Sequence, residues 1–155
     1  MKYYANSIQR GFLFVGHWLK GDLGEDRKDV GMMIKTFCTV FKDVPKKQQP
    51  GMILKTSAAG FSVMDREEIV KKIKEITEPF ADKCPPINLL FGDLTENQMS
   101  SLYHHPKVKT MVSLTHGEGY GRPLQEATMV GLLRKKLIKI MPNRQWKSNN
   151  QLNIE

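Results

Sequence analysis

The stretch THGEGYGRPLQEATMVG, residues 115–131, follows a short apolar run and opens a predicted helix. Gly117, Gly119 and Gly121 let the backbone turn sharply and approach a ligand closely, and proline at position 123 fits the first turn of a helix. Backbone amides of such a turn lie at the positive end of the helix dipole, where phosphate groups bind readily. The stretch therefore predicts a strand, a glycine loop and a helix that together form an anion site.

Two glutamates, Glu118 and Glu126, flank this turn. Helical geometry places Glu126 about one turn into the helix, so that its carboxylate can face the loop. A carboxylate accepts two hydrogen bonds side by side, as a sugar diol offers them. Amides for a diphosphate, one carboxylate for a ribose and another for a transferred sugar are the groups that a nucleotide-sugar site requires. The two glutamates alone also fit a solvated helix face, but the preceding strand and the Gly-x-Gly-x-Pro turn favour the site.

The rest of the chain alternates short apolar runs with helical patterns. Strands are predicted at residues 12–16, 52–54, 85–92 and 107–114. Helices are predicted from residue 30 to 41 by the spacing of apolar residues, from Asp65 with Glu68 in an acidic capping box, from Thr95, and from about Pro123. This alternation indicates βαβ crossovers and a Rossmann-like α/β fold, with a parallel sheet covered by helices on both faces.

Ligands of such sheets bind beyond the carboxyl ends of the strands. Three glycine-bearing loops, after Val15, Phe91 and Leu114, follow strand ends in this prediction. We therefore expect these loops to lie on the same rim of the sheet.

The composition, 40% hydrophobic and 26% charged, is typical of one soluble globular domain. No apolar run approaches the roughly 18 residues of a membrane span, and the run at residues 12–15 is too short for a signal-peptide core. We therefore expect a cytoplasmic protein. Cys38 and Cys84 have no partner histidine spacing, which favours buried or free thiols over a disulfide or a zinc site.

The net charge of +8 is concentrated near one end of the chain. Residues 132–155 contain six basic residues and one acidic residue, a net charge of +5, which leaves +3 for the other 131 residues. Nucleic-acid-binding domains usually gather their positive charge on a folded face. Nucleic acid is therefore the less favoured partner.

The opening stretch resembles the Glu-x7-Glu signature of the retaining GT-B glycosyltransferases of the group-1, glycogen-synthase-like superfamily. The familiar form of this signature is Glu-Gly-Phe-Gly-x-Pro-x-x-Glu. The residues that match it are Glu118, Gly119, Tyr120, Gly121, Pro123 and Glu126, with tyrosine in place of phenylalanine. The resemblance covers residues from about 12 to 132 and implies the C-terminal, donor-binding half of such an enzyme.

The resemblance also implies roles for individual residues. Glu118 would approach the hydroxyls of the transferred sugar, and Glu126 would bind the ribose of the nucleotide. Lys28, together with the loop from Gly117 and the amides of residues 119–122, would stabilise negative charge on the departing diphosphate, with about 3 to 4 kcal/mol for one well-placed donor. No metal or other cofactor is implied, and the sequence contains no Asp-x-Asp pair.

Other positions of the donor site depart from the family or allow two interpretations. His17 stands where the family often has an arginine just after the first strand, and Arg27 is the nearby substitute. Gly92 matches the glycine that lets the nucleotide base lie against the backbone. Arg122 fits either a phosphate ligand or a solvated side chain, and His116 fits either a ligand contact or a solvent-facing loop residue.

Residues 133–155, LRKKLIKIMPNRQWKSNNQLNIE, depart from the family, which continues with another strand. The spacing of Leu133, Leu137, Ile140 and Met141 predicts an extended helix followed by a polar, basic tail; a truncated or frame-shifted gene would look the same. By the same resemblance, we expect that the chain lacks the N-terminal acceptor domain. We therefore expect half of an enzyme that needs a missing domain or partner chain for its unknown acceptor, with an exposed sheet edge that promotes association.

The competing hypothesis is a non-catalytic nucleotide- or nucleic-acid-binding α/β domain in which both glutamates are solvated. A remnant that binds nothing is the third. The sequence identifies neither the nucleotide nor the sugar.

Overall fold

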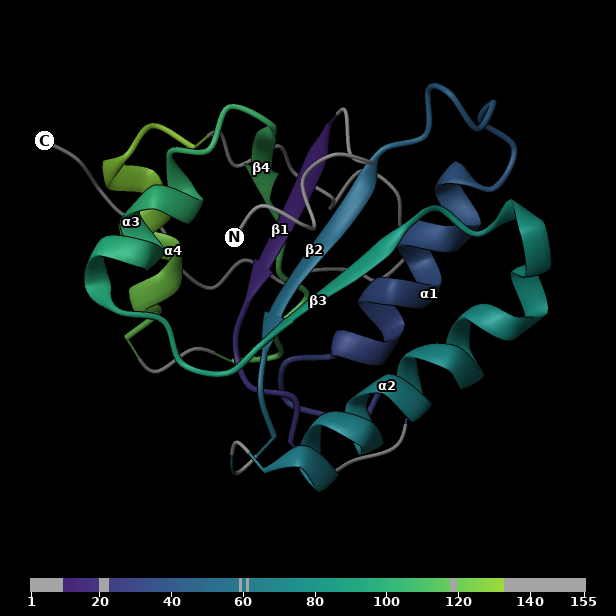
Figure 1. Ribbon diagram of the computed structural model, residues 1–155, viewed down its shortest axis with the longest axis horizontal. Coiled ribbons are helices and arrows are strands. Elements are labelled where there is room, and N and C mark those ends of the chain that lie inside the picture. Colours follow the sequence, from purple (N-terminus) through teal and green to yellow (C-terminus); the bar gives the residue numbers. More distant parts are fainter. Residues whose placement is uncertain (1–9, 20–22, 59, 61, 118–119, 133–155) are drawn as a thin grey trace, which may run out of the picture.

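A computed structural model describes residues 10–19, 23–58, 60, 62–117 and 120–132. Its strands β1 (Gly11–Val15), β2 (Gly51–Thr56), β3 (Ile87–Phe91) and β4 (Val108–Met111) form one parallel sheet in the order β3-β2-β1-β4 (Figure 1). The helices are α1 (Val30–Phe41), α2 (Val63–Thr77), the 3-10 helix η1 (Glu78–Lys83), α3 (Glu96–Tyr103) and α4 (Arg122–Met129). This architecture confirms the predicted Rossmann-like α/β fold.

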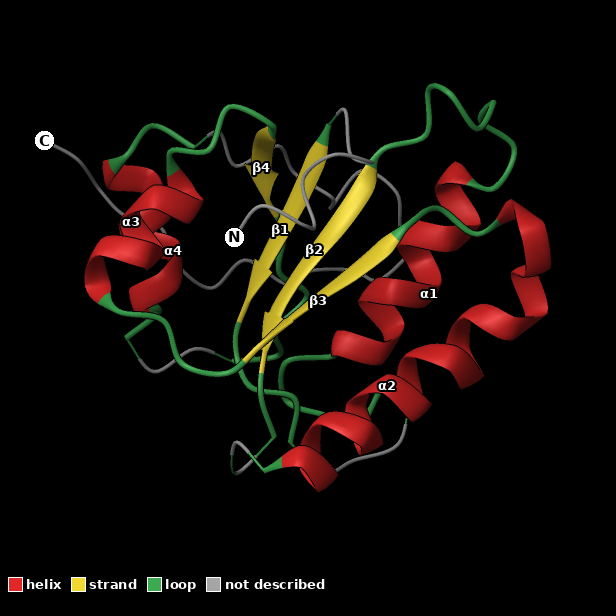
Figure 2. Cartoon of the chain, viewed as in Figure 1, coloured by secondary structure: helices red, strands yellow, loops and turns green. Residues whose placement is uncertain are grey.

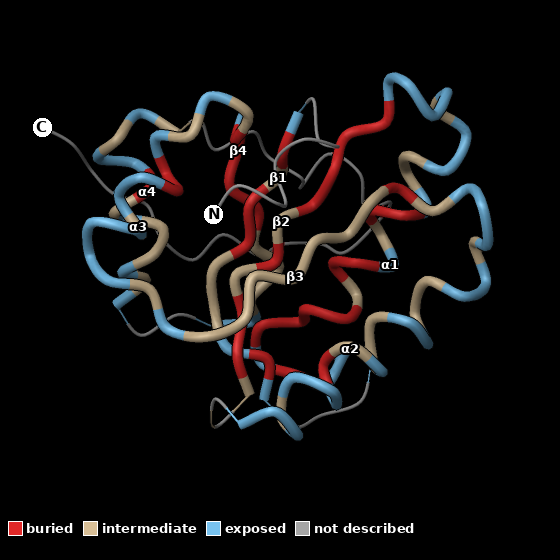
Figure 3. The backbone as a smooth tube through the Cα atoms, viewed as in Figure 1, coloured by how far each residue is buried: buried red, intermediate tan, exposed pale blue. Residues whose placement is uncertain are grey.

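Helices cover both faces of the sheet: α1 and α2 lie on one side, and α3 and α4 lie on the other (Figure 2). Side chains alternate between the two faces along each strand. On β1, Phe14 packs into the core beneath α1 and α2, whereas its neighbour Leu13 packs against α3 and α4. Both side chains are fully buried, and buried residues make up much of β1 (Figure 3). Burial on both faces explains why the strand is a continuous apolar run.

The helix predicted at residues 30–41 is confirmed as α1. Its apolar face packs on β1 through three aromatic rings, with centroids 5.4 Å apart between Phe12 and Phe37, 5.5 Å between Phe12 and Phe41, and 4.9 Å between Phe37 and Phe41. Edge-on and tilted pairs at these distances add to the free energy gained from burying the rings. This contact holds α1 against the strand that leads into the candidate site.

The predicted N-cap of α2 was wrong. Ser62 caps the helix instead: its Oγ accepts from the backbone amide of Asp65 at 3.1 Å, and the Asp65 carboxylate accepts from the Ser62 amide at 3.0 Å. The expected acidic capping box placed Asp65 at the N-cap with Glu68 as its partner, but both residues lie inside the observed helix. Serine at the cap position satisfies an amide that otherwise has no partner in the helix. By contrast, the predicted N-cap Thr95 of α3 is confirmed and forms a capping box with Gln98.

Helix α4 ends in a Schellman motif. The amide of Gly131 donates to the carbonyl of Thr128, and the amide of Leu132 donates to the carbonyl of Ala127. Gly131 has φ of 72°, a conformation that glycine adopts without steric cost. Helix α4 therefore ends before Gly131, and the helix extension predicted for residues 133–155 lies outside the described part of the chain.

The strand order creates a switch point between β1 and β4. The connections from β1 to β2 and from β2 to β3 move in one direction across the sheet, and the chain then returns so that β4 pairs with the other side of β1. The loops leaving β1 and β4 lead to helices on opposite faces of the sheet (Figure 2), and such switch points are where ligands bind in open α/β sheets. Within the described ranges, no helix is long and apolar enough to cross a membrane.

The Ser62→Ala substitution tests the corrected cap of α2. Because the substitution removes the acceptor for the Asp65 amide, the free energy of unfolding should fall by about 1 kcal/mol in urea denaturation. Ser101→Ala in the interior of α3 is the control, and it should change stability by less than about 0.5 kcal/mol. Equal stability of the Ser62→Ala protein and the wild type would contradict the assignment.

Candidate functional site

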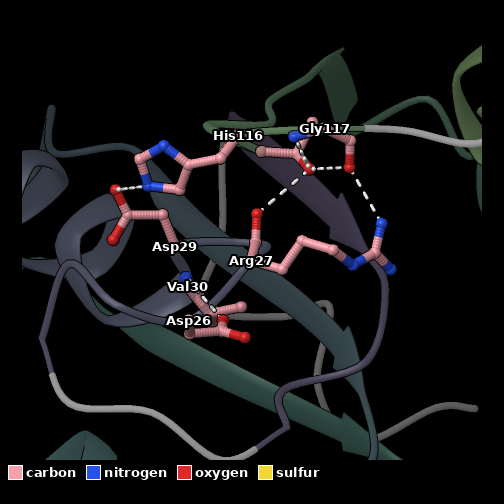
Figure 4. A network of polar contacts seen from close by, with 7 residues as sticks. Asp26, Arg27, Asp29, Val30, His116 and Gly117 are labelled. Atoms are coloured by element: carbon pink, nitrogen blue, oxygen red, sulfur yellow. Dashed lines mark hydrogen bonds and ion pairs between the residues drawn. The ribbon is translucent and has the colours of Figure 1, made fainter.

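The loops after β1 and β4 are bound to each other at the switch point (Figure 4). The carbonyl of Arg27 accepts from the amide of His116 at 2.9 Å and from the hydroxyl of Thr115 at 3.2 Å. The Arg27 guanidinium in turn donates to the carbonyl of Gly117 at 2.8 Å. These bonds join residues about 90 positions apart and hold the start of the glycine loop against the entrance to α1.

A buried acid lies beneath this contact. Asp29 caps α1 with φ of 51° and ψ of 41°, a left-handed conformation that is uncommon outside glycine, asparagine and aspartate. Its Oδ2 lies 3.3 Å from Nε2 of His116, and its buried Oδ1 has no hydrogen-bond partner among the described residues. Asp26 supports the turn, because its carboxylate accepts from the amide of Val30 at 3.3 Å. His116, which the sequence left open, thus contacts the protein itself.

Lys28 enters the same region from the α1 side and is 8% exposed. Its Cε lies 3.7 Å from the place that a Cβ on Gly16 would occupy, and that Cβ would lie only 2.9 Å from the Phe14 ring. Glycine at the end of β1 therefore leaves room for both side chains. The structure brings Lys28 to the carboxyl edge of β1.

The loops after β2 and β3 are also tied to this edge. His17 Nδ1 lies 2.8 Å from the hydroxyl of Ser57, so its imidazole is engaged with the loop after β2. Lys55, at the end of β2, donates to the carbonyl of Gly92 at 2.6 Å. Burial lowers the pKa of Lys55, and the nearby carboxylate of Asp93 partly offsets that effect. The Gly92 turn has φ of 101°, which requires glycine.

The glycine loop leads into α4 through Gly121, which is the N-cap and adopts a left-handed conformation with φ of 67°. No described side chain caps this helix end, and Pro123 in its first turn has no amide hydrogen. Glu118 and Gly119 lie outside the described residues, and Tyr120 is 79% exposed. Four peptide units span at most about 14 Å. The Gly117 contact and the start of α4 are therefore at most about 14 Å apart.

Glu126 lies one turn into α4, and both of its carboxylate oxygens have partners. Oε2 accepts from the hydroxyl of Tyr103 on α3 at 3.1 Å, and Oε1 accepts from Nε of Arg122 at 2.7 Å. Burial, and secondarily the Glu126 carboxylate, raises the pKa of Tyr103 well above its usual value, whereas the hydrogen bond to Glu126 raises the pKa of Arg122. Tyr103 is 3% exposed, while the Arg122 side chain is 72% exposed.

A cavity of about 520 Å³ lies between α3 and α4 and includes Glu126 in its lining. Apolar side chains supply much of its wall, and Tyr103 and Arg122 contribute polar groups. The apolar residues that line this cavity are Leu94, Met99, Pro123, Met129 and Val130. A mostly apolar hollow with a few converging polar groups is typical of small-molecule sites. The arrangement can accept an apolar ring system beside a hydroxylated group held by the carboxylate.

Trp18 and the two cysteines belong to the packing of the core beneath α1 and α2. Trp18 is buried in the core, and the ammonium of Lys72 lies 5.8 Å from the centroid of its ring. The prediction of free cysteines is confirmed, because Cys38 and Cys84 both carry free thiols. Among the described residues, no three histidine, cysteine, aspartate or glutamate side chains gather where they could hold a metal ion. Metal independence stays a prediction.

Sequence reasoning missed Tyr103 and Lys55 as parts of the site. A tyrosine on the buried face of a helix needs a partner for its hydroxyl, which was the available signal for Tyr103. The partner Glu126 lies 23 positions away, and nothing local identifies it. Lys55 lies in an apolar strand, and its local sequence does not mark it as a site residue. Its acceptor, the carbonyl of Gly92, can be identified only from the pairing of β2 with β3.

Comparison with solved structures identifies the fold. The chain is similar to the C-terminal domain of a group 1 family glycosyl transferase, LpcC, from Francisella tularensis, with a TM-score of 0.53 and 19% sequence identity. The match covers 78% of this chain and 53% of that one, so the chain spans about half the length of the solved structure. No protein-family profile matches the sequence, and no curated protein matches it significantly. The fold is therefore that of the C-terminal domain of a GT-B glycosyltransferase.

The Tyr103→Phe substitution tests the link between α3 and α4. It removes the hydroxyl that donates to Glu126 and leaves the ring in place, so the free energy of unfolding should fall by about 1 to 2 kcal/mol. Tyr120→Phe is the matched control; because Tyr120 is exposed, its substitution should cost less than about 0.5 kcal/mol. Equal losses in urea denaturation would contradict a specific role for the Tyr103 hydroxyl.

The contribution of Tyr103 should depend on pH. Its pKa is raised in the folded chain, so its stabilisation is fully present below the unfolded value of about 10 and is lost as the pH rises from there toward the folded pKa. The difference in unfolding free energy between wild type and Tyr103→Phe should be constant from about pH 7 to 9. Above about pH 10 it should shrink by up to about 1.4 kcal/mol per pH unit. A difference that grows in this range would refute the assigned direction.

Proposed function

We propose that this chain is the donor-binding half of a glycosyltransferase that uses a nucleoside diphosphate sugar. The observation that carries the proposal is the position of Glu126, which lines a cavity one turn inside the helix that follows the glycine loop. The fold of the C-terminal domain of a GT-B glycosyltransferase supports the same reading. The proposal includes transfer with retention and independence of metal. It also includes an unknown acceptor that another domain or chain would bind.

Glu126 would bind the two hydroxyls of the ribose. Tyr103 is buried and fixes the carboxylate through Oε2, whereas Arg122 holds Oε1 from an exposed position. Because the Arg122 side chain is exposed, water screens its ion pair with Glu126, and the pair contributes little. A ribose hydroxyl can therefore replace Arg122 at Oε1 at little cost, while the tyrosine keeps the carboxylate oriented. Leu94 and Val130 would contact the base in the apolar part of the cavity.

The diphosphate would lie at the start of α4. The amides of residues 120–122 precede Pro123, and the helix dipole favours an anion at this end. When the bond between the anomeric carbon and the phosphate oxygen breaks, its electron pair moves to the diphosphate. These amides and the ammonium of Lys28 would stabilise that charge, with about 3 to 4 kcal/mol for one well-placed donor. Glu118 is assigned to the transferred sugar by the sequence resemblance alone.

A binding screen with a matched pair of ligands tests the role of Glu126. UDP-, GDP- and ADP-sugars are first compared by saturation-transfer NMR, and the tightest binder is then measured beside its 2′-deoxyribose analogue. Glu126→Ala should weaken binding of the parent ligand by about 1 to 3 kcal/mol, roughly 5- to 150-fold, because a charged hydrogen-bond pair is lost. The wild type should bind the deoxy analogue more weakly than the parent ligand. The Glu126→Ala variant should bind the deoxy analogue at least as tightly as the parent ligand.

Glu67→Ala is the control for this experiment, since Glu67 is an exposed glutamate of α2 on the opposite face of the sheet. It should bind the donor as the wild type does. The ribose assignment is refuted if removal of the 2′-hydroxyl from the ligand weakens binding to Glu126→Ala as much as it weakens binding to the wild type. Salt-sensitive binding to polynucleotide without binding of any nucleotide sugar would favour the non-catalytic alternative.

A further inference from the structure

The two cysteines lie together although they are 46 positions apart. Cys38 Sγ and Cys84 Sγ are 3.0 Å from each other. Cys38 is fully buried on α1, and Cys84 is half-buried in the segment between η1 and β3. The sequence predicted free thiols and could not predict their proximity, because it depends on how η1 packs against α1.

Groups other than the thiols hold the pair in place. The side-chain amide of Gln49 donates to the carbonyl of Phe41, at the end of α1, and to the carbonyl of Lys83, at the end of η1, at 3.1 and 3.2 Å. Gln49 is itself buried. The Cys84 thiol is oriented by the Pro85 carbonyl 3.4 Å away. The two sulfurs are therefore neighbours in the folded chain and need to approach by only about 1 Å to form a bond.

We propose that Cys38 and Cys84 form an intramolecular disulfide by exchange with a low-molecular-weight disulfide such as oxidised glutathione. The Cys84 thiolate attacks one glutathione sulfur, which forms a mixed disulfide and releases one glutathione. Cys38 then attacks the Cys84 sulfur, the bond to glutathione breaks, and the second glutathione leaves. The two protein thiols are oxidised, one glutathione disulfide is reduced, and the two thiol protons end on the two released glutathiones.

Exposure determines the order of these steps. Cys84 is the half-buried member of the pair and can be reached by the reagent, whereas Cys38 is enclosed by the core beneath α1 and α2. Burial, and secondarily the hydrogen bond to Cys84, raises the pKa of Cys38, so its thiolate is scarce at neutral pH. Cys84 therefore reacts first and Cys38 resolves the mixed disulfide in a slower step.

The disulfide would stabilise the fold on the side remote from the candidate site. It would join α1 to the segment that enters β3 and close a loop that contains β2 and α2. Cys84 precedes the amino end of β3, while the glycine loops follow the carboxyl ends of the strands. Cross-linking a loop of this length restricts mainly the unfolded chain. The proposal therefore stands independently of any nucleotide binding.

Equilibration of the folded full-length chain with oxidised and reduced glutathione tests the proposal. The wild type should lose both free thiols and two hydrogen masses without gaining glutathione, and peptide mapping should identify a Cys38–Cys84 bond. The thermal midpoint of the oxidised chain should rise by roughly 5 to 15 °C above that of the reduced chain.

Cys84→Ser is the matched control, since it should form no internal bond and its thermal midpoint should not respond to the redox buffer. Cys38→Ala provides a second control if the serine variant fails to fold, and it should accumulate the glutathione adduct at Cys84. The proposal is overturned if the folded wild type yields only glutathione adducts or linked dimers. It is equally overturned if both thiols stay free under conditions that oxidise the unfolded chain.

Discussion

Strand β1 lies between β2 and β4 and pairs with both in parallel, and this pairing determines where the chain can bind a ligand. Parallel strands bring all their carboxyl ends to one edge, and the loops that leave β1 and β4 there lead to helices on opposite faces of the sheet (Figure 2). The sheet also needs apolar cover on both faces, which α1 and α2 supply on one side and α3 and α4 on the other. The edge of β1 and β4 is thus where irregular backbone and polar side chains can gather.

The contact between the two loops at that edge carries an energetic cost. Asp29 is held in a left-handed conformation, and one of its buried carboxylate oxygens has no partner among the described residues. Conformations of this kind persist only where the surroundings determine them, and they cluster at functional sites. His116, the backbone of Arg27 and the turn supported by Asp26 provide those surroundings. The strain therefore coincides with the place where topology predicts a ligand.

The departure from the family pattern at His17 has a structural counterpart. The imidazole bonds to Ser57 in the loop after β2, and the guanidinium of Arg27 bonds to a carbonyl of the glycine loop. The first contact ties two loops of the edge together, and the second directs a cation at the protein's own backbone. In the proposed site, Lys28 and the amides at the start of α4 would contribute to the charge compensation for a diphosphate.

The elements could be predicted from sequence wherever a local pattern determines them. The apolar spacing of α1, the threonine cap of α3 and the proline in the first turn of α4 each depend on residues within one or two turns. The cap of α2 was misplaced because Ser62 and Asp65 both have side chains that can cap a helix.

The alternation of strands and helices, and with it the α/β fold, could be predicted from the residue pattern because backbone periodicity is a short-range property. The same holds for the glycine loop before α4 and for the carboxylate one turn into that helix. The contacts of Tyr103 with Glu126, of Arg27 with Gly117 and of Cys38 with Cys84 depend instead on tertiary packing. These contacts join residues 23 to 90 positions apart, and their partners are set by how whole helices and loops pack on the sheet.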